Sequence, residues 1–483
     1  MADDLGIRDV AEEKGVLWAG TDDGIVQISR DNGGNWTNVT PKDMPRFGLV
    51  NTIETSPHDA ARAFLAVTAY RTDDYRPYIF RTDDYGRTWT LVSNGNGIPT
   101  NHFIRVVRED PVRKGLLYAG GEFGVYVSFN DGREWQSLQS NLPVTPVTDL
   151  VVSQGDLVLS TNGRSFWILD DMTPLRELAA RPSQTASHLF QPRDSYRIRT
   201  SADEADDAYV FGACCVANAR DIFTGARIER HQLGEDPPEG AIIYASFPRA
   251  PTEAVTLSIL GAGDTIIRTV FDTGKNADGS PKIVAGLNRF NWDLRADPLG
   301  AGRQGGAPGP TVVPGRYQVR LTVGSRTETA PLTVQMDPRL TRVHVTTQDL
   351  QKQYDLLAQI KDAVSQIQRA ATAVRERRAR LTQPSPAAGN QEQVAALTAL
   401  ERELVGVAEG GRGGGRGGGG GRGGGPQPLL SEFTSLYNFV ADSEDKPTAG
   451  ASARWNELKK SLDEKLARVN AQTSSGGESK KHP

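Results

Sequence analysis

Cysteine is almost absent from this sequence: Cys214 and Cys215 are the only two among 483 residues. Neighbouring residues lie closer together than the Cα separation that a disulfide prefers, which excludes a disulfide framework. The six histidines are scattered and show no zinc-ligand spacing, so we expect neither a metal nor another cofactor. We interpret the cysteine pair as free thiols in a small apolar patch.

Long apolar runs and an excess of one charge are also missing. No run approaches the roughly 18 apolar residues of a membrane helix, so we expect no membrane span. Lys and Arg number 55 against 59 Asp and Glu, so no global field indicates a nucleic-acid partner. The first residues, 1–5, carry no recognisable secretory signal, which leaves the location unknown. The length predicts about three domains.

A motif of the form [ST]-x-[DN]-x-G-x-x-W occurs three times, at 29–36, 82–89 and 128–135. Its tryptophans follow one another at steps of 53 and 46 residues, close to the length of one propeller blade. The acidic or amide side chain can accept backbone N–H bonds in a turn where glycine supplies a positive φ. We expect each tryptophan to begin the next strand and pack inward. These structural positions are Asp31, Gly33, Trp36, Asp84, Gly86, Trp89, Asn130, Gly132 and Trp135.

This motif resembles the Asp-box, or BNR, repeat of sialidases, sortilin-type receptors and xyloglucanases. The segments LWAGTDDG, RTDDYRPYIFRT, LLYAGGEFGVYVS and NGRSFWILDD look like the last blades of large bacterial sortilin-like or glycosyl-hydrolase-like BNR proteins. The resemblance implies a partial β-propeller of about four blades over 1–178 and an extracytoplasmic location, periplasmic or secreted. Four blades are the lower limit of closed rings. We therefore expect a fragment of a longer protein, or a ring that needs blades from a partner chain.

The order of strands in a blade predicts where binding residues collect. For one blade we predict strands at 51–55, 64–68, 78–82 and 89–93. Successive hairpins alternate between the two ends of a sheet, so the motif turns lie at one end and the other connections at the opposite end. Those connections carry the weak catalytic candidates Asp22, Asp23, Asp73, Asp74 and Glu122, and the ligand-binding candidates Tyr70, Arg71, Tyr75, Arg76, Asn162 and Arg164.

This mixture of side chains allows several interpretations. Aromatic rings stack on sugars, and paired carboxylates can act as acid and base in glycoside hydrolysis. Ordinary polar turns use the same residues. The leading hypothesis is a binding or scaffold module that recognises a glycan or polypeptide through one loop face. The alternative is a glycoside hydrolase remnant or subunit, sialidase-like or xyloglucanase-like, that uses paired carboxylates.

The rest of the chain changes character. We expect a connector at 179–238, then an immunoglobulin-like β-sandwich at 239–338 with strands that alternate apolar and polar residues. The segments GLNRFNWDLR and PGRYQVRL resemble the flagellar-hook-capping type of Ig-like domain, with Trp292 in its core.

A helical region completes the predicted fold class, mainly β with a helical C-terminal hairpin or bundle. Apolar residues at helical spacing predict helices at 346–408 and 428–472, and Thr346 with Asp349 forms a capping arrangement. Between them, 409–427 is rich in Gly and Arg. We interpret it as a flexible linker, because three arginines without aromatics are weak evidence for RNA binding. Residues 473–483 are expected to be disordered.

Overall fold

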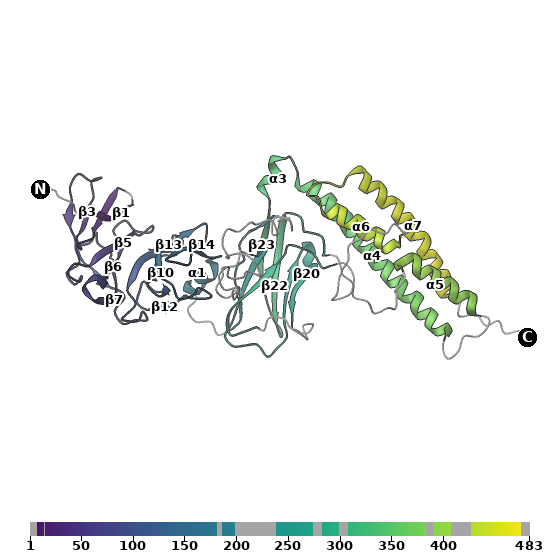
Figure 1. Cartoon of the computed structure of the whole chain (residues 1–483), viewed down its shortest axis with the longest axis horizontal. Coiled ribbons are helices and arrows are strands. Elements are labelled where there is room, and N and C mark those ends of the chain that lie inside the picture. The colour runs from purple at the N-terminus through teal and green to yellow at the C-terminus, as the bar shows by residue number, and fades with distance from the viewer. Residues whose placement is uncertain are drawn as a thin grey trace, which may run out of the picture. The chain divides into compact units, whose positions relative to one another are not determined.

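The computed structural model describes residues 7–13, 15–180, 186–198, 238–273, 283–298, 308–382, 390–406 and 427–474. The chain is mainly β, with several small sheets, and has a helical C-terminal region (Figure 1). It divides into two compact units. The first holds Met1–Gln191, Ser201–Pro237 and Tyr244–Pro248, and the second holds Pro192–Thr200, Pro238–Ile243 and Arg249–Pro483. The cysteine pair, the predicted linker apart from residue 427, and most of the connector lie outside the described residues.

Three four-stranded antiparallel sheets follow one another in the first unit, each with its strands in chain order. The first sheet has β1 (Ile7–Glu13), β2 (Val16–Thr21), β3 (Val26–Ser29) and β4 (Thr37–Asn38). The second has β5 (Leu49–Thr55), β6 (Ala63–Ala69), β7 (Asp74–Thr82) and β8 (Thr90–Leu91). The third has β9 (Ile104–Glu109), β10 (Leu117–Gly121), β11 (Gly124–Ser128) and β12 (Gln136–Ser137). The fourth strand of the second sheet is shorter than the predicted 89–93.

A fourth sheet has three strands, β13 (Val147–Ser153), β14 (Asp156–Thr161) and β15 (Phe166–Leu169). Helix α1 (Thr173–Ala180) follows where the earlier sheets have the motif turn and a fourth strand. Met172 and Leu175 enter the buried cluster against which Leu138 of the third sheet packs. The helix therefore covers apolar surface that the missing motif would otherwise have to cover.

The three motif turns share one hydrogen-bond pattern. In the second turn, the Thr82 hydroxyl donates to Asp84 at 2.9 Å and accepts the Gly86 N–H at 2.9 Å, while Asp84 accepts the Thr88 N–H at 2.9 Å. The first turn repeats these bonds with Asp31. The third repeats them with Asn130, whose amide oxygen accepts the Glu134 N–H at 3.0 Å. The carboxylate or amide oxygen thus closes each turn, as Asx-turn chemistry requires.

The three motif tryptophans differ in burial. Trp135 is buried and Trp89 is half-buried, but Trp36 is 42% exposed. The expectation that all three pack inward is therefore wrong for Trp36. The physical reason is that these indoles pack against the preceding sheet: Trp89 donates to the carbonyl of Val39 at 2.6 Å and Trp135 to that of Val92 at 2.8 Å. No described sheet precedes the one that carries Trp36.

The first strand of each of these four sheets contains one extra residue, at which the pairing register shifts. The extra residues are Arg8, Asn51, Arg105 and Thr148. Such β-bulges redirect a side chain and bend the strand. The same irregularity at the same position marks the four sheets as repeats of one unit, including the fourth, which lacks the motif.

The second unit contains a five-stranded sheet in the order β17-β23-β22-β19-β20. Its strands are β17 (Ser195–Arg197), β19 (Val255–Leu260), β20 (Ile266–Asp272), β22 (Gly315–Val323) and β23 (Arg326–Met336). Strand β17 pairs in parallel with β23, so the predicted irregular connector in fact supplies a strand to this sheet. A further short strand, β16 (His188–Leu189), pairs with the first-unit end of β18 (Ala241–Phe247). Trp292, in β21 (Gly286–Trp292), is buried as predicted.

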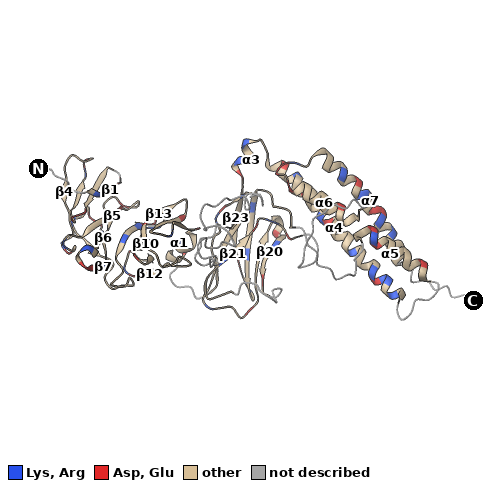
Figure 2. Ribbon diagram, viewed as in Figure 1, with Lys and Arg blue, Asp and Glu red and all other residues tan. Residues whose placement is uncertain are grey.

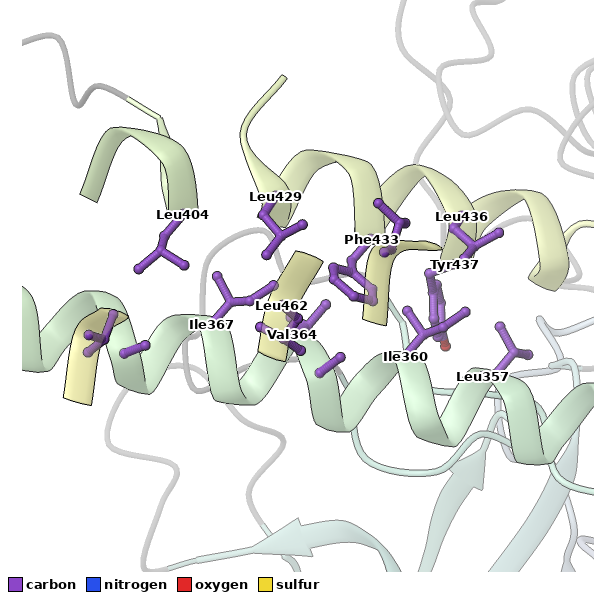
Figure 3. Close-up of a cluster of buried hydrophobic side chains, with 14 of the residues drawn as sticks. Leu357, Ile360, Val364, Ile367, Leu404, Leu429, Phe433, Leu436, Tyr437 and Leu462 are labelled. Carbon is purple, nitrogen blue, oxygen red and sulfur yellow. The ribbon is translucent and has the colours of Figure 1, made fainter. Parts of the chain in front are cut away.

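The C-terminal region contains α3 (Pro338–Arg342), α4 (Thr347–Thr382), α5 (Gln391–Val405), α6 (Leu429–Ala441) and α7 (Ala449–Ser474). Helices α4 to α7 share one apolar core, in which Ile360, Leu404 and Phe433 are fully buried (Figure 3). Charged residues of both signs lie along these helices (Figure 2). The predicted cap is confirmed, because Thr346 Oγ1 accepts the Asp349 N–H at 3.2 Å. No described helix is both long and apolar enough to cross a membrane.

Candidate binding rim of the first unit

One end of the four sheets carries all the candidate residues. Asp22 and Asp23 follow β2, the single-turn 3₁₀ helix η1 (Tyr70–Thr72) precedes β7, Glu122 lies between β10 and β11, and 162–165 lies between β14 and β15. The segments that lead into the first strands of the second, third and fourth sheets reach the same end, because antiparallel strands alternate in direction. We call this end the rim. The motif turns lie at the opposite end.

An aromatic cluster lies on the rim of the second and third sheets. The rings of Tyr70 and Phe103 stack with their centroids 5.2 Å apart, and the Tyr75 ring lies 6.3 Å from Phe103. The guanidinium of Arg105 lies 5.0 Å from the Phe103 centroid and 5.8 Å from that of Tyr70. Tyr75 is 47% exposed, so this cluster offers an aromatic surface to solvent beside a cation.

A second aromatic group adjoins the third sheet. His102 lies 4.3 Å from the Phe123 ring, centroid to centroid, and its Nδ1 is hydrogen-bonded to the Tyr126 hydroxyl. Burial lowers the pKa of His102, which favours the neutral imidazole at pH 7. Phe123 is 38% exposed. Together with the first cluster, these rings make the rim of two adjacent sheets aromatic.

Arg105 is the central cation of the rim. Its Nη2 donates to Glu122 Oε2 at 2.6 Å, which links a strand of the third sheet to the neighbouring hairpin. Its Nε–H is buried and has no acceptor among the described residues. A buried donor without an acceptor costs free energy that an incoming oxygen would recover. The bulge in β9 places this side chain on the rim.

Asp74 is already occupied by neighbouring donors. Arg76 donates to its two oxygens at 2.9 and 2.7 Å, and the Tyr78 hydroxyl donates to Oδ2 at 2.7 Å. The hydrogen bonds from Arg76 hold the pKa of Asp74 well below its usual range, whereas burial raises the pKa of Tyr78 to about 12. Asp74 is therefore a carboxylate at neutral pH. The adjacent Asp73 is exposed and adopts a left-handed φ of 63°.

The remaining candidates lie away from the aromatic cluster. Asp23 accepts the Thr21 hydroxyl at 2.5 Å and closes its own turn, and Asp22 is exposed. The Arg164 carbonyl accepts the Trp167 indole at 2.9 Å, and the Asn162 N–H donates to Pro146 at 2.9 Å. Arg71 is exposed beside Tyr70. No contact described here joins Asp22, Asp23, Asn162 or Arg164 to the aromatic cluster, so the candidates form no single site.

Sequence reasoning missed Phe103, Arg105 and His102. His102 and Phe103 lie in the connection from the second sheet to the third, and Arg105 lies in β9, in a region that the strand order places on the rim. The signal that could have identified them is the segment Asn101-His102-Phe103 before an apolar strand. The bulge that redirects Arg105 depends on strand pairing and leaves no such local signal.

The opposite end of the second and third sheets holds an ionic network around the buried side chains of Arg62 and Glu109. Arg62 donates to Asp83 at 2.7 Å, to Glu109 at 3.1 Å and to Asp131 at 2.8 Å, and the Arg62 and Glu109 side chains are 8% and 0% exposed. These contacts join a hairpin of the second sheet to the third sheet. We interpret this network as structural, because its members satisfy one another. No group of three potential metal ligands occurs within the described ranges.

A groove of about 470 Å³ lies between α6 and α7 and is lined by Ser431, Ser435, Phe439 and Arg454, among others. The Arg454 guanidinium pairs with Glu432 at 3.0 Å and with Glu457 at 2.6 Å. Two carboxylates thus already neutralise this cation.

No family model matches this chain, and no curated protein sequence matches it. Among solved structures, YCF48 bound to D1 peptide aligns at 15% identity with a TM-score of 0.28, over 34% of this chain and 52% of that one. YCF48 from Cyanidioschyzon merolae aligns at 14% identity with a TM-score of 0.28, over 35% of this chain and 54% of that one. This chain therefore spans about half the length of these two structures.

A glycoside hydrolase also aligns. The GH74 xyloglucanase from Xanthomonas campestris aligns at 12% identity with a TM-score of 0.28, over 67% of this chain and 66% of that one. Likenesses at this level assign no residue of this chain a role.

Proposed function

We propose that the first unit is a binding or scaffold module that recognises a glycan or polypeptide through its rim. The observation that carries this proposal is the aromatic cluster of Tyr70, Tyr75 and Phe103 around Arg105, whose buried Nε–H has no acceptor among the described residues. Exposed aromatic faces stack on sugar rings or on the side chains of a peptide. The Arg105 donor would then fix the orientation of a ligand oxygen.

The alternative function, glycoside hydrolysis by paired carboxylates, has less support. A general acid must hold a proton at the working pH, and the bonds from Arg76 to Asp74 favour its charged form. Glu122 is paired with Arg105. Two of the five carboxyl candidates are thus engaged by arginines, and Asp22 and Asp23 lie outside the aromatic cluster. A rim built this way is better suited to binding than to proton transfer.

The experiment that tests the proposal separates binding from turnover. The wild-type chain and the double variant Asp73→Asn with Asp74→Asn are incubated with a panel of polysaccharides, and both retention and released sugar are measured. Retention without released sugar from the wild-type chain supports a binding module. Released sugar that disappears in the double variant supports the hydrolase instead. If the wild-type chain neither binds a polysaccharide nor releases sugar, a glycan is excluded as the ligand. A peptide array then tests whether the rim binds a polypeptide.

The finer description of the fold is part of the same proposal. We propose that the four sheets are blades of a partial Asp-box propeller, which the repeated turn and the repeated bulge support. We also propose that the sheet of the second unit belongs to an Ig-like sandwich of the hook-capping type, with domain limits near 239 and 338. An extracytoplasmic location fits this class of protein. Detection of the protein in a periplasmic or secreted fraction of its source would test the location.

A further inference from the structure

The outward face of the first sheet repeats a surface that is buried in the other three. The shared bulge gives the alignment, because Ile7, Val50, Ile104 and Val147 each stand immediately before the extra residue. Val50, Ile104 and Val147 are 0% exposed, because they pack against the preceding sheet, whereas Ile7 is 62% exposed. The apolar side chain at this position is therefore buried in an interface between sheets in three cases, and is exposed to solvent in the first sheet.

A second position on this face shows the same contrast. Val10 is 56% exposed, while its counterparts Ile53, Val107 and Leu150 are 2%, 0% and 1% exposed. The motif tryptophan follows the same rule, since Trp36 is 42% exposed and Trp135 only 3%. Three apolar side chains of the first sheet are thus open where their counterparts are covered.

Two of the motif glycines lie where a neighbouring sheet leaves no room for a side chain. A Cβ on Gly86 would lie 2.8 Å from Val39 of the preceding sheet, and a Cβ on Gly132 would lie 2.9 Å from Val92. A Cβ on Gly33 would meet only Leu17 of its own sheet, at 3.6 Å. The first sheet therefore presents one half of a contact that is complete at the next two sheets.

The outward face of the fourth sheet presents the other half. Phe166 is 73% exposed, whereas its counterparts Val26, Ile79 and Val125 are 0%, 0% and 1% exposed, because each is covered by the following sheet. Ile168 is 56% exposed, and its counterparts Ile28 and Val127 are 4% and 2% exposed. Val151 of β13 is also 50% exposed.

The two open faces belong to opposite sides of the same interface. Contact between consecutive sheets occurs three times inside the unit, with a front face and a rear face each time. The first sheet leaves a front face open and the fourth leaves a rear face open. Because both faces are exposed in the single chain, the front face of the first sheet does not pack on the rear face of the fourth sheet of the same chain. Exposed apolar patches of this kind mark association surfaces.

We propose that the occupant of both faces is a second copy of this chain, joined head to tail. The front face of each copy would pack on the rear face of the other, which closes eight sheets around a two-fold axis. A second copy is favoured because it supplies both missing halves at once. A ring of eight sheets is within the range of known propellers, and closure stops the head-to-tail contact from continuing into a fibre. This inference does not depend on what the rim binds.

The test measures the mass of the full chain in solution by light scattering after size-exclusion chromatography, with reductant to prevent cross-links through Cys214 or Cys215. The expected mass is about 105 kDa, twice 52.3 kDa. Val10→Asp and Phe166→Asp each place a charge in the proposed contact, and each variant alone is expected to run as a monomer. Val112→Asp is the matched control, because Val112 is 69% exposed at a hairpin outside both faces, and it should remain a dimer.

Mixing the two variants distinguishes the head-to-tail arrangement from any other. Val10→Asp keeps an intact rear face and Phe166→Asp keeps an intact front face, so the mixture should form a heterodimer through one undamaged interface. Circular dichroism checks that both variants are folded. A monomeric wild type overturns the proposal, as does a dimer that neither substitution weakens. If the mass rises above that of a dimer as the protein concentration increases, the ring does not close. If the two variants do not associate when mixed, the pairing is not head to tail.

Discussion

The indole Nε1 of Trp135 donates a 2.8 Å hydrogen bond to the carbonyl oxygen of Val92, which directly follows the last strand of the preceding sheet. Trp89 makes the same bond to Val39 at 2.6 Å. The motif that closes a turn within one sheet therefore also joins that sheet to the one before it. This second role explains why the position that holds Trp36 behaves differently when no described sheet precedes it.

Trp135→Phe should destabilise the first unit more than Trp36→Phe. The change at Trp135 removes a buried hydrogen bond to the Val92 carbonyl, which keeps the Asn96 Nδ2 donor at 3.0 Å, so the cost is about 0.5–1.5 kcal/mol. Trp36 is exposed and makes no such described bond, so Trp36→Phe should have little effect on folding of the chain. Urea unfolding followed by circular dichroism gives the two midpoints. Equal midpoints in the two variants would contradict the role assigned to the indole bond.

Asp84→Ala should destabilise the second turn, whereas Asp84→Asn should be milder. Alanine removes the acceptor for Thr82, for the Thr88 N–H and for the Thr88 hydroxyl, a loss of about 1–2 kcal/mol by analogy with a lost helix cap. Asparagine keeps one oxygen, as Asn130 does in the third turn. Urea midpoints for the two variants rank them. A milder effect for alanine than for asparagine would show that the side-chain oxygen does not close the turn.

Glu54 should make the stability depend on pH. Burial raises the pKa of Glu54 from 4.5 to about 7, so the folded state holds a proton that the unfolded state releases between these values. The protonated side chain stabilises the folded state fully below pH 4.5, and this stabilisation is lost as the pH rises through about 7. The free energy of unfolding should fall by at most about 3 kcal/mol over this range. Glu54→Gln imitates the protonated side chain. The variant should therefore exceed the wild type in stability at about pH 8 and match it at low pH, and a constant difference across this range would refute the assignment.

Gln353 should contribute to the stability of the second unit. Its amide is buried and donates to the Val440 carbonyl at 2.8 Å, while its oxygen accepts from Arg197 at 3.4 Å. Gln353→Leu keeps the approximate volume and removes both bonds, although Arg197 keeps its pair with Glu444 and the Val440 carbonyl keeps the Ser443 hydroxyl, so we expect a loss of about 1–2 kcal/mol. Gln351→Leu, at an exposed position two residues earlier in α4, is the control and should change stability little. Thermal unfolding followed by the helical signal measures both, and equal effects would contradict the buried network.

Much of the first unit follows from local sequence. The motif predicts three turns because the hydroxyl, carboxylate and glycine act within a few residues of one another, and the turns at Asp31, Asp84 and Asn130 repeat one pattern. Burial of the tryptophan depends on a neighbouring sheet, which a local motif does not encode. This is why Trp36 differs from the expectation.

The site was less accessible to sequence reasoning. Hairpin order was enough to assign the candidates to one end of the sheets, but which of them meet depends on the bulge at Arg105 and on stacking across two sheets. Asp74 reads in the sequence as a possible catalytic acid, and only its distances to Arg76 and Tyr78 reveal that it is engaged. The strand β17 was missed because three residues carry too little periodicity to predict a strand.

The most direct test of the binding function is a paired glycan and peptide array probed with the wild-type chain, with Tyr75→Ala and with Arg87→Ala. Tyr75 belongs to the rim cluster, and Arg87 is exposed at the opposite end of the same sheet. We expect selective signals from the wild type that fall at least about tenfold in Tyr75→Ala, a change equivalent to about 1.4 kcal/mol, and persist in Arg87→Ala. Selective signals that both variants retain, or that Arg87→Ala alone loses, would contradict the binding function.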